Sequence, residues 1–306
     1  MANKIEWLQL PGYIAETWNP VTGCTKISEG CANCWAEKMS KRMAGRYGYP
    51  ISEPFAVTRH RDKYFEPFSW RNPRMVFVGS MGDLFHYDVP TSLIHDLFNI
   101  METEENQKHL FLILTKRAER LYNFISDRWI GYTPENIWLG VTAENIKTAS
   151  RRIPLLLGTP AVKRFVSLEP LLESINLKKV PIKQYATFID CLSGYCYGEM
   201  YEDLKTFHPE LDWVIVGGES GPKARPMHPD WVRSIREQCN LTGTPFFFKQ
   251  WGAWMPESQI QRNIKSYEID MMGQEIMHRV GKKHAGRKLD GREHNEYPTV
   301  ETRHCL

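Results

Sequence analysis

The sequence lacks the long apolar runs that mark membrane proteins. No stretch approaches the roughly 18 consecutive apolar residues of a membrane-spanning helix. The first residues, Met1 to Trp7, lack the apolar core of a signal peptide. Internal repeats and low-complexity tracts are also absent, which excludes solenoids and fibrous arrays. We therefore expect a cytoplasmic protein without membrane segments.

The chain also lacks a strong excess of charge. Its net charge is +3 over 306 residues, which alone indicates no polyanionic partner. The distribution is less even, because residues 38–74 hold nine Lys/Arg against three Asp/Glu and residues 278–294 hold six against two. Both segments could meet phosphates, and an ordinary solvated surface is the alternative. Nucleic acid is therefore a candidate partner.

Cysteine is scarce, but three of the seven residues are clustered. Cys24, Cys31 and Cys34 follow a C-x6-C-x2-C spacing in a stretch that contains two glycines. In a reducing compartment such a cluster favours metal ligation over disulfides. A structural zinc site is normally closed by four ligands, so three thiolates leave one position of a metal centre open for chemistry. The remaining cysteines are scattered and are expected to be plain thiols: Cys191, Cys196, Cys239 and Cys305.

Short apolar runs alternate with amphipathic segments along most of the chain. The runs are typical of strands buried on both faces, and they cover 75–78, 110–114, 137–141, 164–168, 213–216 and 245–248. Helical patterns fall at 90–101, 115–130, 147–157 and 229–239, the third containing Pro154. This alternation predicts parallel strands with right-handed crossovers, as in a full or partial (β/α) barrel, with a doubly wound sheet as the alternative.

Two segments interrupt the alternation. Residues 178–212 are expected to be an insertion, and residues 253–306, which are polar and weakly periodic, a C-terminal extension. We thus predict a barrel domain over 1–252 and an extension over 253–306.

The predicted strands end in polar residues. In parallel α/β folds the carboxyl ends of the strands form the active site. Here they offer the side chains of Asp83, Thr115, Lys116, Thr142, Glu144, Asn145, Glu169 and Glu219. The turn Gly217-Gly218-Glu219-Ser220-Gly221 would let a ligand approach the backbone closely. Together with the cysteines, these strand ends predict a cofactor site.

Five motifs carry a resemblance to a known family. They cover residues 18–24 (WNPVTGC), 80–86 (SMGDLFH), 114–117 (LTKR), 216–221 (VGGESG) and 247–252 (FFKQWG). The chain resembles the phage family named for gene products thirty-seven and sixty-eight, from about residue 18 to about residue 298. That family is similar to radical S-adenosylmethionine (SAM) enzymes. Their common cysteine spacing is C-x3-C-x2-C, so this chain has three more residues between its first two cysteines.

The resemblance implies a radical-SAM-like partial (β/α) TIM-like barrel of about six parallel strands. It implies a [4Fe–4S] cluster on Cys24, Cys31 and Cys34 and SAM on the fourth iron. The activity would be generation of a 5′-deoxyadenosyl radical that modifies a substrate, for which a nucleic acid or nucleotide is the candidate. The family's genes often lie beside a partner protein named for the three-cysteine motif, so a protein complex is also implied.

By the same resemblance, other residues would contact SAM or the substrate. Ser80, Gly82 and Asp83 would bind the SAM amino group, and Thr142, Glu144 and Asn145 would face the ribose. Glu169, Gly217, Gly218, Glu219 and Ser220 would close around the adenine or the substrate. Lys116 and Lys249 could hold an anionic group, either the SAM carboxylate or a substrate phosphate.

Two other functions remain open from the sequence. Cys191, Cys196 or a histidine could complete a closed zinc site, which would make the protein a nucleic-acid-interaction or assembly module without redox chemistry. Alternatively, Asp83, Glu169 and Glu219 could hold Mg²⁺ in a hydrolase, with His86 and His228 as acid or base.

Overall fold

A seven-stranded parallel sheet, curved into a half-barrel, organises the protein. The computed structural model describes residues 5–182, 187–198, 209–260 and 264–300. The sheet has the order β1-β4-β5-β6-β7-β11-β12. Its strands are β1 (Ile14–Trp18), β4 (Arg74–Val78), β5 (Leu110–Thr115), β6 (Ile137–Thr142), β7 (Arg164–Leu168), β11 (Trp213–Gly217) and β12 (Phe246–Gln250). Every pairing in this sheet is parallel. The predicted partial barrel is confirmed.

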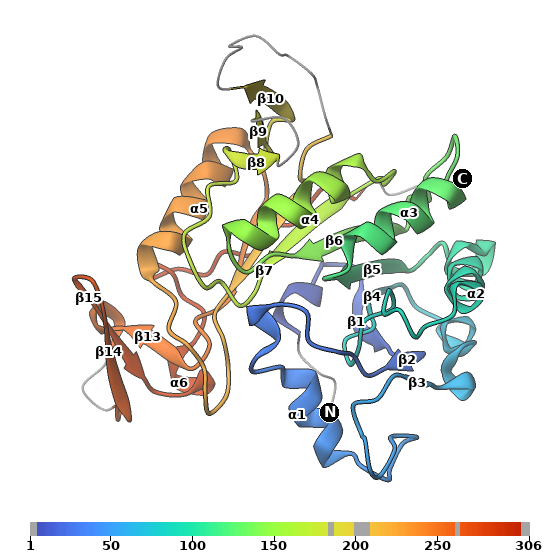
Figure 1. Ribbon diagram of the computed structural model, residues 1–306, viewed down its shortest axis with the longest axis horizontal. Helices are drawn as coiled ribbons and strands as arrows, with labels where there is room; N and C mark the ends of the chain where they lie inside the picture. The colour runs from blue at the N-terminus through green and yellow to red at the C-terminus, as the bar shows by residue number, and fades with distance from the viewer. Residues whose placement is uncertain (1–4, 183–186, 199–208, 261–263, 301–306) are drawn as a thin grey trace.

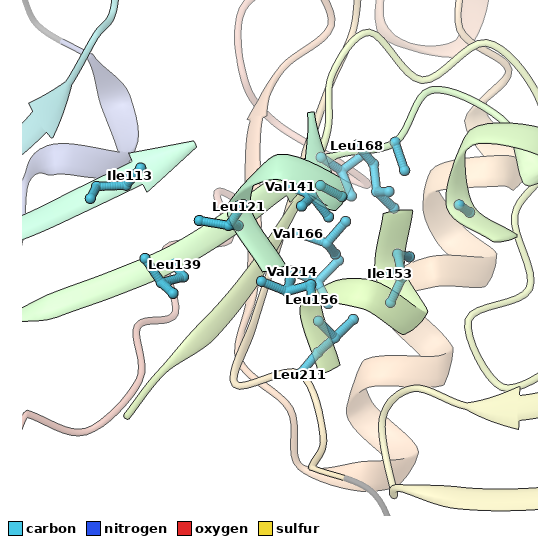
Figure 2. Packing of buried hydrophobic residues seen from close by; sticks show 14 of the residues in the cluster. Ile113, Leu121, Leu139, Val141, Ile153, Leu156, Val166, Leu168, Leu211 and Val214 are labelled. Atoms are coloured by element: carbon cyan, nitrogen blue, oxygen red, sulfur yellow. The ribbon is translucent and has the colours of Figure 1, made fainter. Parts of the chain in front are cut away.

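Four long helices cover the convex face of the sheet (Figure 1). They are α2 (Thr91–Glu102), α3 (Ala118–Arg128), α4 (Ile146–Gly158) and α5 (Pro229–Thr242). Figure 2 shows Val141, Val166 and Val214 of neighbouring strands packed beside Ile153 and Leu156 of α4. Each helix matches an amphipathic segment of the sequence, and α4 continues through Pro154.

The concave face holds a second core. Met75, Leu112, Trp138 and Phe165 point inward, one residue out of phase with the outward set. Both faces of the strands are therefore apolar, which explains the continuous apolar runs. The 3₁₀ helix η1 (Glu6–Leu8) packs against β1, β4 and β12, so its Trp7 and Leu8 fill the space between the first and last strands.

Three smaller sheets surround the half-barrel. The insertion forms β8 (Val180–Ile182), β9 (Thr187–Asp190) and β10 (Tyr195–Gly198). Near the C-terminus lie β13 (Trp254–Pro256), β14 (Glu268–Met272) and β15 (Glu275–Arg279), with the short helix α6 (Lys282–Ala285) after them. A backbone bridge joins Asn295 to Phe247 of β12, so the C-terminal segment packs on the edge of the barrel. The domain boundary at residue 252 stays a prediction.

The longest crossover, between β1 and β4, has no crossover helix of the usual kind. It contains β2 (Val21–Thr22), η2 (Glu29–Cys31), α1 (Trp35–Arg42), β3 (Thr58–Arg59), η3 (Arg61–Lys63) and η4 (Glu66–Ser69). Strand β2 pairs with β3 in an antiparallel ribbon. The remaining 3₁₀ helices are η5 (Glu104–Asn106) and η6 (Glu257–Gln259). In the described residues no helix is long and apolar enough to cross a membrane.

Candidate functional site

A cavity of about 500 Å³ lies at the carboxyl ends of the strands. Cys24, Cys31 and Cys34 all line it, together with the apolar side chains of Trp7 and Phe77. This volume is within the range of small-molecule and cofactor sites. The three cysteines therefore share one cavity with the strand ends.

The cysteines belong to one loop, residues 23–34, which we call the cysteine loop. Cys24 follows β2, Cys31 ends η2, and Cys34 precedes the first residue of α1. The loop starts at Gly23, whose φ of +86° disfavours any other residue. A Cβ on Gly23 would lie 2.2 Å from the carbonyl oxygen of Ala56. This glycine is thus required for the chain to reach Cys24 along its observed path.

Asp83, in the turn that follows β4, positions Cys24 through Arg117. Its Oδ2 accepts a hydrogen bond of 2.8 Å from Arg117 Nη1, and the same nitrogen lies 3.3 Å from Cys24 Sγ. Arg117 also donates to the hydroxyl of Thr25 at 3.1 Å. Thr115 donates to the other oxygen of Asp83 at 2.7 Å. Because Asp83 and Arg117 are both buried, this pair fixes the position of Cys24.

Glu144, just after β6, holds the middle of the loop. Ser28 donates a hydrogen bond of 2.5 Å to its Oε1, and Arg152 of α4 donates to its Oε2 at 2.9 Å. Gly30 packs so closely that a Cβ there would lie 2.3 Å from Glu144 Cγ. Burial alone would raise the pKa of Glu144, but Lys116 and Arg152 outweigh burial and hold the pKa below its usual value. The carboxylate is therefore charged and directed at the loop.

Glu219, just after β11, holds the end of the loop. Asn33 donates to its Oε2 at 2.9 Å, and Arg225 forms two side-chain hydrogen bonds with the carboxylate at 2.7 and 2.9 Å. Arg225 also donates to the carbonyl of Glu29 at 3.0 Å. Burial would raise the pKa of Glu219, but the hydrogen bonds from Arg225 and Asn33 keep the pKa low. Three strand-end carboxylates, each paired with an arginine, thus hold one loop.

The thiols experience different electrostatic environments. Burial raises the pKa of Cys24, and the charge of Asp83 raises it further, while the charge and the hydrogen bond of Arg117 oppose this rise without cancelling it. Burial would also raise the pKa of Cys31, but backbone hydrogen bonding at Ile27 and the charge of Lys116 outweigh it, so this pKa is lowered. A lowered pKa increases the thiolate fraction, and the thiolate is the form that binds metals.

The other predicted contact residues are divided between the cavity and the surrounding core. Residues that line the cavity, besides Asp83 and Glu219, are Ser80, Gly82, Thr142, Glu169, Gly218 and Ser220. Glu144, Asn145 and Gly217 do not line it. Asn145 caps α4 by accepting a hydrogen bond from the backbone of Thr148. Gly217 packs against the side chain of Glu169, because a Cβ added to Gly217 would lie 3.1 Å from the carboxylate carbon of Glu169.

The two strand-end lysines differ in their pairing. Lys249 Nζ lies 2.8 Å from Glu169, which also accepts from Gln250 at 3.1 Å. Lys116 Nζ is 4.0 Å from Glu144, at the limit of an ion pair, and lines the cavity. Lys116 is therefore the better placed of the two to meet an anionic ligand.

The sequence reasoning missed several residues of the site. The three arginines Arg117, Arg152 and Arg225 were not predicted to hold the loop, and Ser167 and Trp7 were not predicted to line the cavity. Ser167 of β7 is the register partner of Thr142 of β6, so two hydroxyl side chains lie on adjacent strands. Ser167 could have been recognised as a site residue, because it is a polar residue within a predicted apolar strand. No local signal marks Trp7 or the arginine partners.

The proposed fourth zinc ligands lie elsewhere. Cys191 directly follows β9 and Cys196 lies in β10, and Figure 1 shows both strands far from α1. Within the described residues, no three His, Cys, Asp or Glu side chains come together as ligands of one metal ion. Three partly buried thiols on one cavity are a donor set of the kind that binds an iron–sulfur cluster, and neither Cys191 nor Cys196 lines that cavity to close a zinc site.

The carboxylates of the magnesium alternative are all engaged with cations. Asp83, Glu169 and Glu219 pair with Arg117, Lys249 and Arg225. His86 contacts the hydroxyl of Thr25 at 2.8 Å, whereas His228 caps α5. This arrangement gives no support to a hydrolytic magnesium site.

Comparison with known proteins gave one match. A family model described as "Protein of unknown function (DUF5131)" matches residues 2–298. No curated protein and no solved structure matches the chain.

Proposed function

We propose that this chain, which belongs to the DUF5131 family, is a radical-SAM-like iron–sulfur enzyme that acts on a substrate in the cavity at the strand ends. The single observation that carries the proposal is the convergence of Cys24, Cys31 and Cys34 on that cavity. Thiolates are the usual protein ligands of [4Fe–4S] clusters, and three of them leave one iron free for a second ligand.

In this proposal the cluster would be held by the cysteine loop and SAM by the strand ends. When bound, the two groups supply a one-electron reduction that breaks a sulfonium carbon–sulfur bond and so permits radical chemistry on the substrate. Lys116 would bind the SAM carboxylate, since it lines the cavity and is only weakly paired. Thr142 and Ser167 would donate to or accept from the ribose hydroxyls.

The protein's own contribution is to position the cysteine loop and to exclude water from the cavity. The carboxylates Asp83, Glu144 and Glu219 hold the cysteine loop against three different strands. We therefore assign these three acids to orientation of the loop, rather than to direct contact with SAM. Trp7, Phe77 and Leu114 give the cavity an apolar wall, which limits the access of water to a reactive centre.

Anaerobic reconstitution with iron and sulfide tests the proposal. The expected protein has bound iron and sulfide and broad visible absorption, and it converts SAM to methionine and 5′-deoxyadenosine when dithionite supplies the electron. Cys31→Ala should lose the iron and the absorption. Cys196→Ala is the matched control, because Cys196 is partly buried but lies outside the cavity. Zinc without iron, or iron that survives Cys31→Ala, would overturn the proposal.

A further inference from the structure

Four exposed arginines lie in the crossover that carries the cysteine loop. They are Arg42, the last residue of α1, Arg46 just after that helix, and Arg59 and Arg61 in and just after β3. In the part of the chain that the structure describes, none of them forms an ion pair with a carboxylate, whereas neighbouring Lys41 pairs with Glu37. Residues 41–63 hold six Lys/Arg and two Asp/Glu. The net charge of this segment, +4, thus exceeds the +3 of the whole chain.

The two loops that carry these pairs of arginines pack together. The rings of Tyr49 and His60 lie 5.7 Å apart, and a Cβ on Gly48 would be 2.8 Å from His60 Nδ1. Arg46 is close in sequence to Gly48, and Arg59 and Arg61 flank His60. We call Arg42, Arg46, Arg59 and Arg61 the arginine surface.

Aromatic side chains accompany the arginine surface. Tyr47, next to Arg46, is 74% exposed, and Phe65, just beyond η3, is 67% exposed. The Phe65 ring lies 6.3 Å from that of Phe68, which is also exposed. Exposed rings of this size are unfavourable in water. In proteins that bind single-stranded nucleic acids, the bases stack on such rings and nearby arginines contact the phosphates.

The segment that carries the arginine surface also reaches the wall of the cavity. Phe55 lines the cavity, and its carbonyl oxygen accepts a hydrogen bond of 3.2 Å from the backbone of Cys24. His60 lies 2.8 Å from the hydroxyl of Thr22, the last residue of β2 before the cysteine loop. A polymer bound on the arginine surface would therefore lie beside the loop that lines the cavity.

The other basic segment of the sequence differs from the arginine surface in two respects. In residues 278–294, three of the six cations are in ion pairs: Arg279 with Glu268, Lys282 with Glu6, and Arg287 with Glu293. The other three are exposed and form no ion pair among the described residues, but the segment contains no Phe, Tyr or Trp. The combination of unpaired arginines with exposed aromatic rings therefore favours the arginine surface.

We propose that the arginine surface binds single-stranded nucleic acid, with phosphates on the arginines and bases stacked on Tyr47 and Phe65. The substrate of the cavity would then be a nucleotide of that strand. This last step rests on the proposed function, whereas the binding itself does not.

Fluorescence anisotropy of a labelled single-stranded oligonucleotide of mixed sequence tests the proposal on the full chain. Replacing Arg46 and Arg61 together by Ala should weaken binding about tenfold or more at low salt. Because each lost phosphate contact removes one released counterion, the slope of log K against log salt should fall by about 0.7 for each arginine. Phe65→Ala should weaken binding about fivefold or more with an unchanged slope.

Matched controls separate these effects from general changes. Arg151→Ala removes an exposed arginine from α4, and Tyr267→Ala an exposed aromatic residue beside β14, so both should bind like the parent protein. Unchanged thermal unfolding of the variants would establish that they fold. Cys31→Ala should bind the oligonucleotide normally, so that loss of the cluster and loss of binding are distinguishable.

Several results would overturn the proposal. They are absence of oligonucleotide binding, binding that the arginine and Phe65 variants leave unchanged, and tighter binding of duplex than of single strand. Binding of an acidic peptide in place of the oligonucleotide, with the same dependence on the arginines, would assign the surface to a protein partner and would likewise overturn it.

Discussion

Ser28 of the cysteine loop donates a 2.5 Å hydrogen bond to the fully buried carboxylate of Glu144. The two residues lie 116 positions apart in the chain. Their contact joins a loop before the second strand of the sheet to the end of its central strand β6. The conformation of the cysteine loop therefore depends on a contact with the barrel and not only on contacts within the loop.

Glu144→Gln tests this contact. The amide keeps the size of the side chain but removes the charge that Arg152 and Lys116 face. Leaving a buried arginine unpaired should lower the free energy of unfolding by about 3 kcal/mol, measured by urea denaturation of the iron-free protein. The thiols of the cysteine loop should also react faster with a thiol reagent.

Glu105→Gln, at an exposed position, is the control for Glu144→Gln and should match the parent protein in both measurements. An unfolding curve that Glu144→Gln leaves in place would show that the buried ion pair does not hold the loop.

The Asp83–Arg117 pair should control the acidity of Cys24. Asp83 raises the pKa of this thiol and Arg117 lowers it, on top of the larger effect of burial. Asp83→Asn should therefore move the pH at which Cys24 of the iron-free protein is half alkylated downwards, and Arg117→Met should move it upwards. Mass spectrometry of Cys24 after iodoacetamide treatment over a pH series measures both. Shifts in the same direction for both variants would contradict the arrangement.

Gly23 provides a steric test at the start of the cysteine loop. Gly23→Ala places a Cβ 2.2 Å from the carbonyl of Ala56 at a φ of +86°. We expect a loss of about 3 kcal/mol or more in unfolding free energy, with reduced iron binding after reconstitution.

Gly12→Ala is the matched control for Gly23→Ala. Gly12 has a φ of +88°, but nothing lies within 4 Å of a Cβ there, so only the backbone penalty of about 1 kcal/mol applies. Equal losses for the two variants would show that the contact with Ala56 is unimportant.

His109 should make the protein sensitive to acid. Burial lowers the pKa of this side chain to about 4, with smaller effects from Lys108 and Arg74. The unfolded chain takes up the proton near pH 6.5 and the folded chain only near pH 4, so stability falls as the pH drops between these values. The loss attributable to His109 should reach about 3 kcal/mol.

His109→Asn should flatten this acid limb, because an amide takes up no proton between pH 4 and pH 7. The amide oxygen can still accept the hydrogen bond from the backbone of Arg74, so the fold should be kept. Urea denaturation between pH 4 and pH 7 measures it, and His284→Asn, at an exposed position, should leave the limb unchanged. An identical pH dependence in His109→Asn and the parent protein would refute the explanation.

The inner strands and outer helices could be predicted from the sequence, because the pattern of apolar residues within each segment indicates its secondary structure. Strands such as β5 and β6 are apolar on both faces, and α2 repeats leucine and isoleucine at helical spacing. Strand β1 (Ile14–Trp18) was missed because it lies at the edge of the sheet, where Glu16 and Thr17 are half-buried and break the apolar run. Helix α1 was missed because it buries few apolar side chains.

The site was predictable only in part for a similar reason. The clustered cysteines and the acids at strand ends can be recognised locally, and parallel topology brings strand ends together. The partner of each acid cannot be recognised in this way, since Arg117 and Arg152 are ordinary residues of their own segments. The sequence therefore predicts that Glu144 contacts a ligand, whereas its carboxylate binds Arg152 and Ser28 in the structure.

The filling of the barrel has a consequence for synthesis of the chain. Trp7 from the beginning and Tyr297 from near the end both pack on Trp213 inside the half-barrel. The inner core cannot be completed until Tyr297 has emerged from the ribosome. Contacts so distant in sequence also favour slow folding, so a nascent chain would expose the concave face of the sheet until that residue has been synthesised.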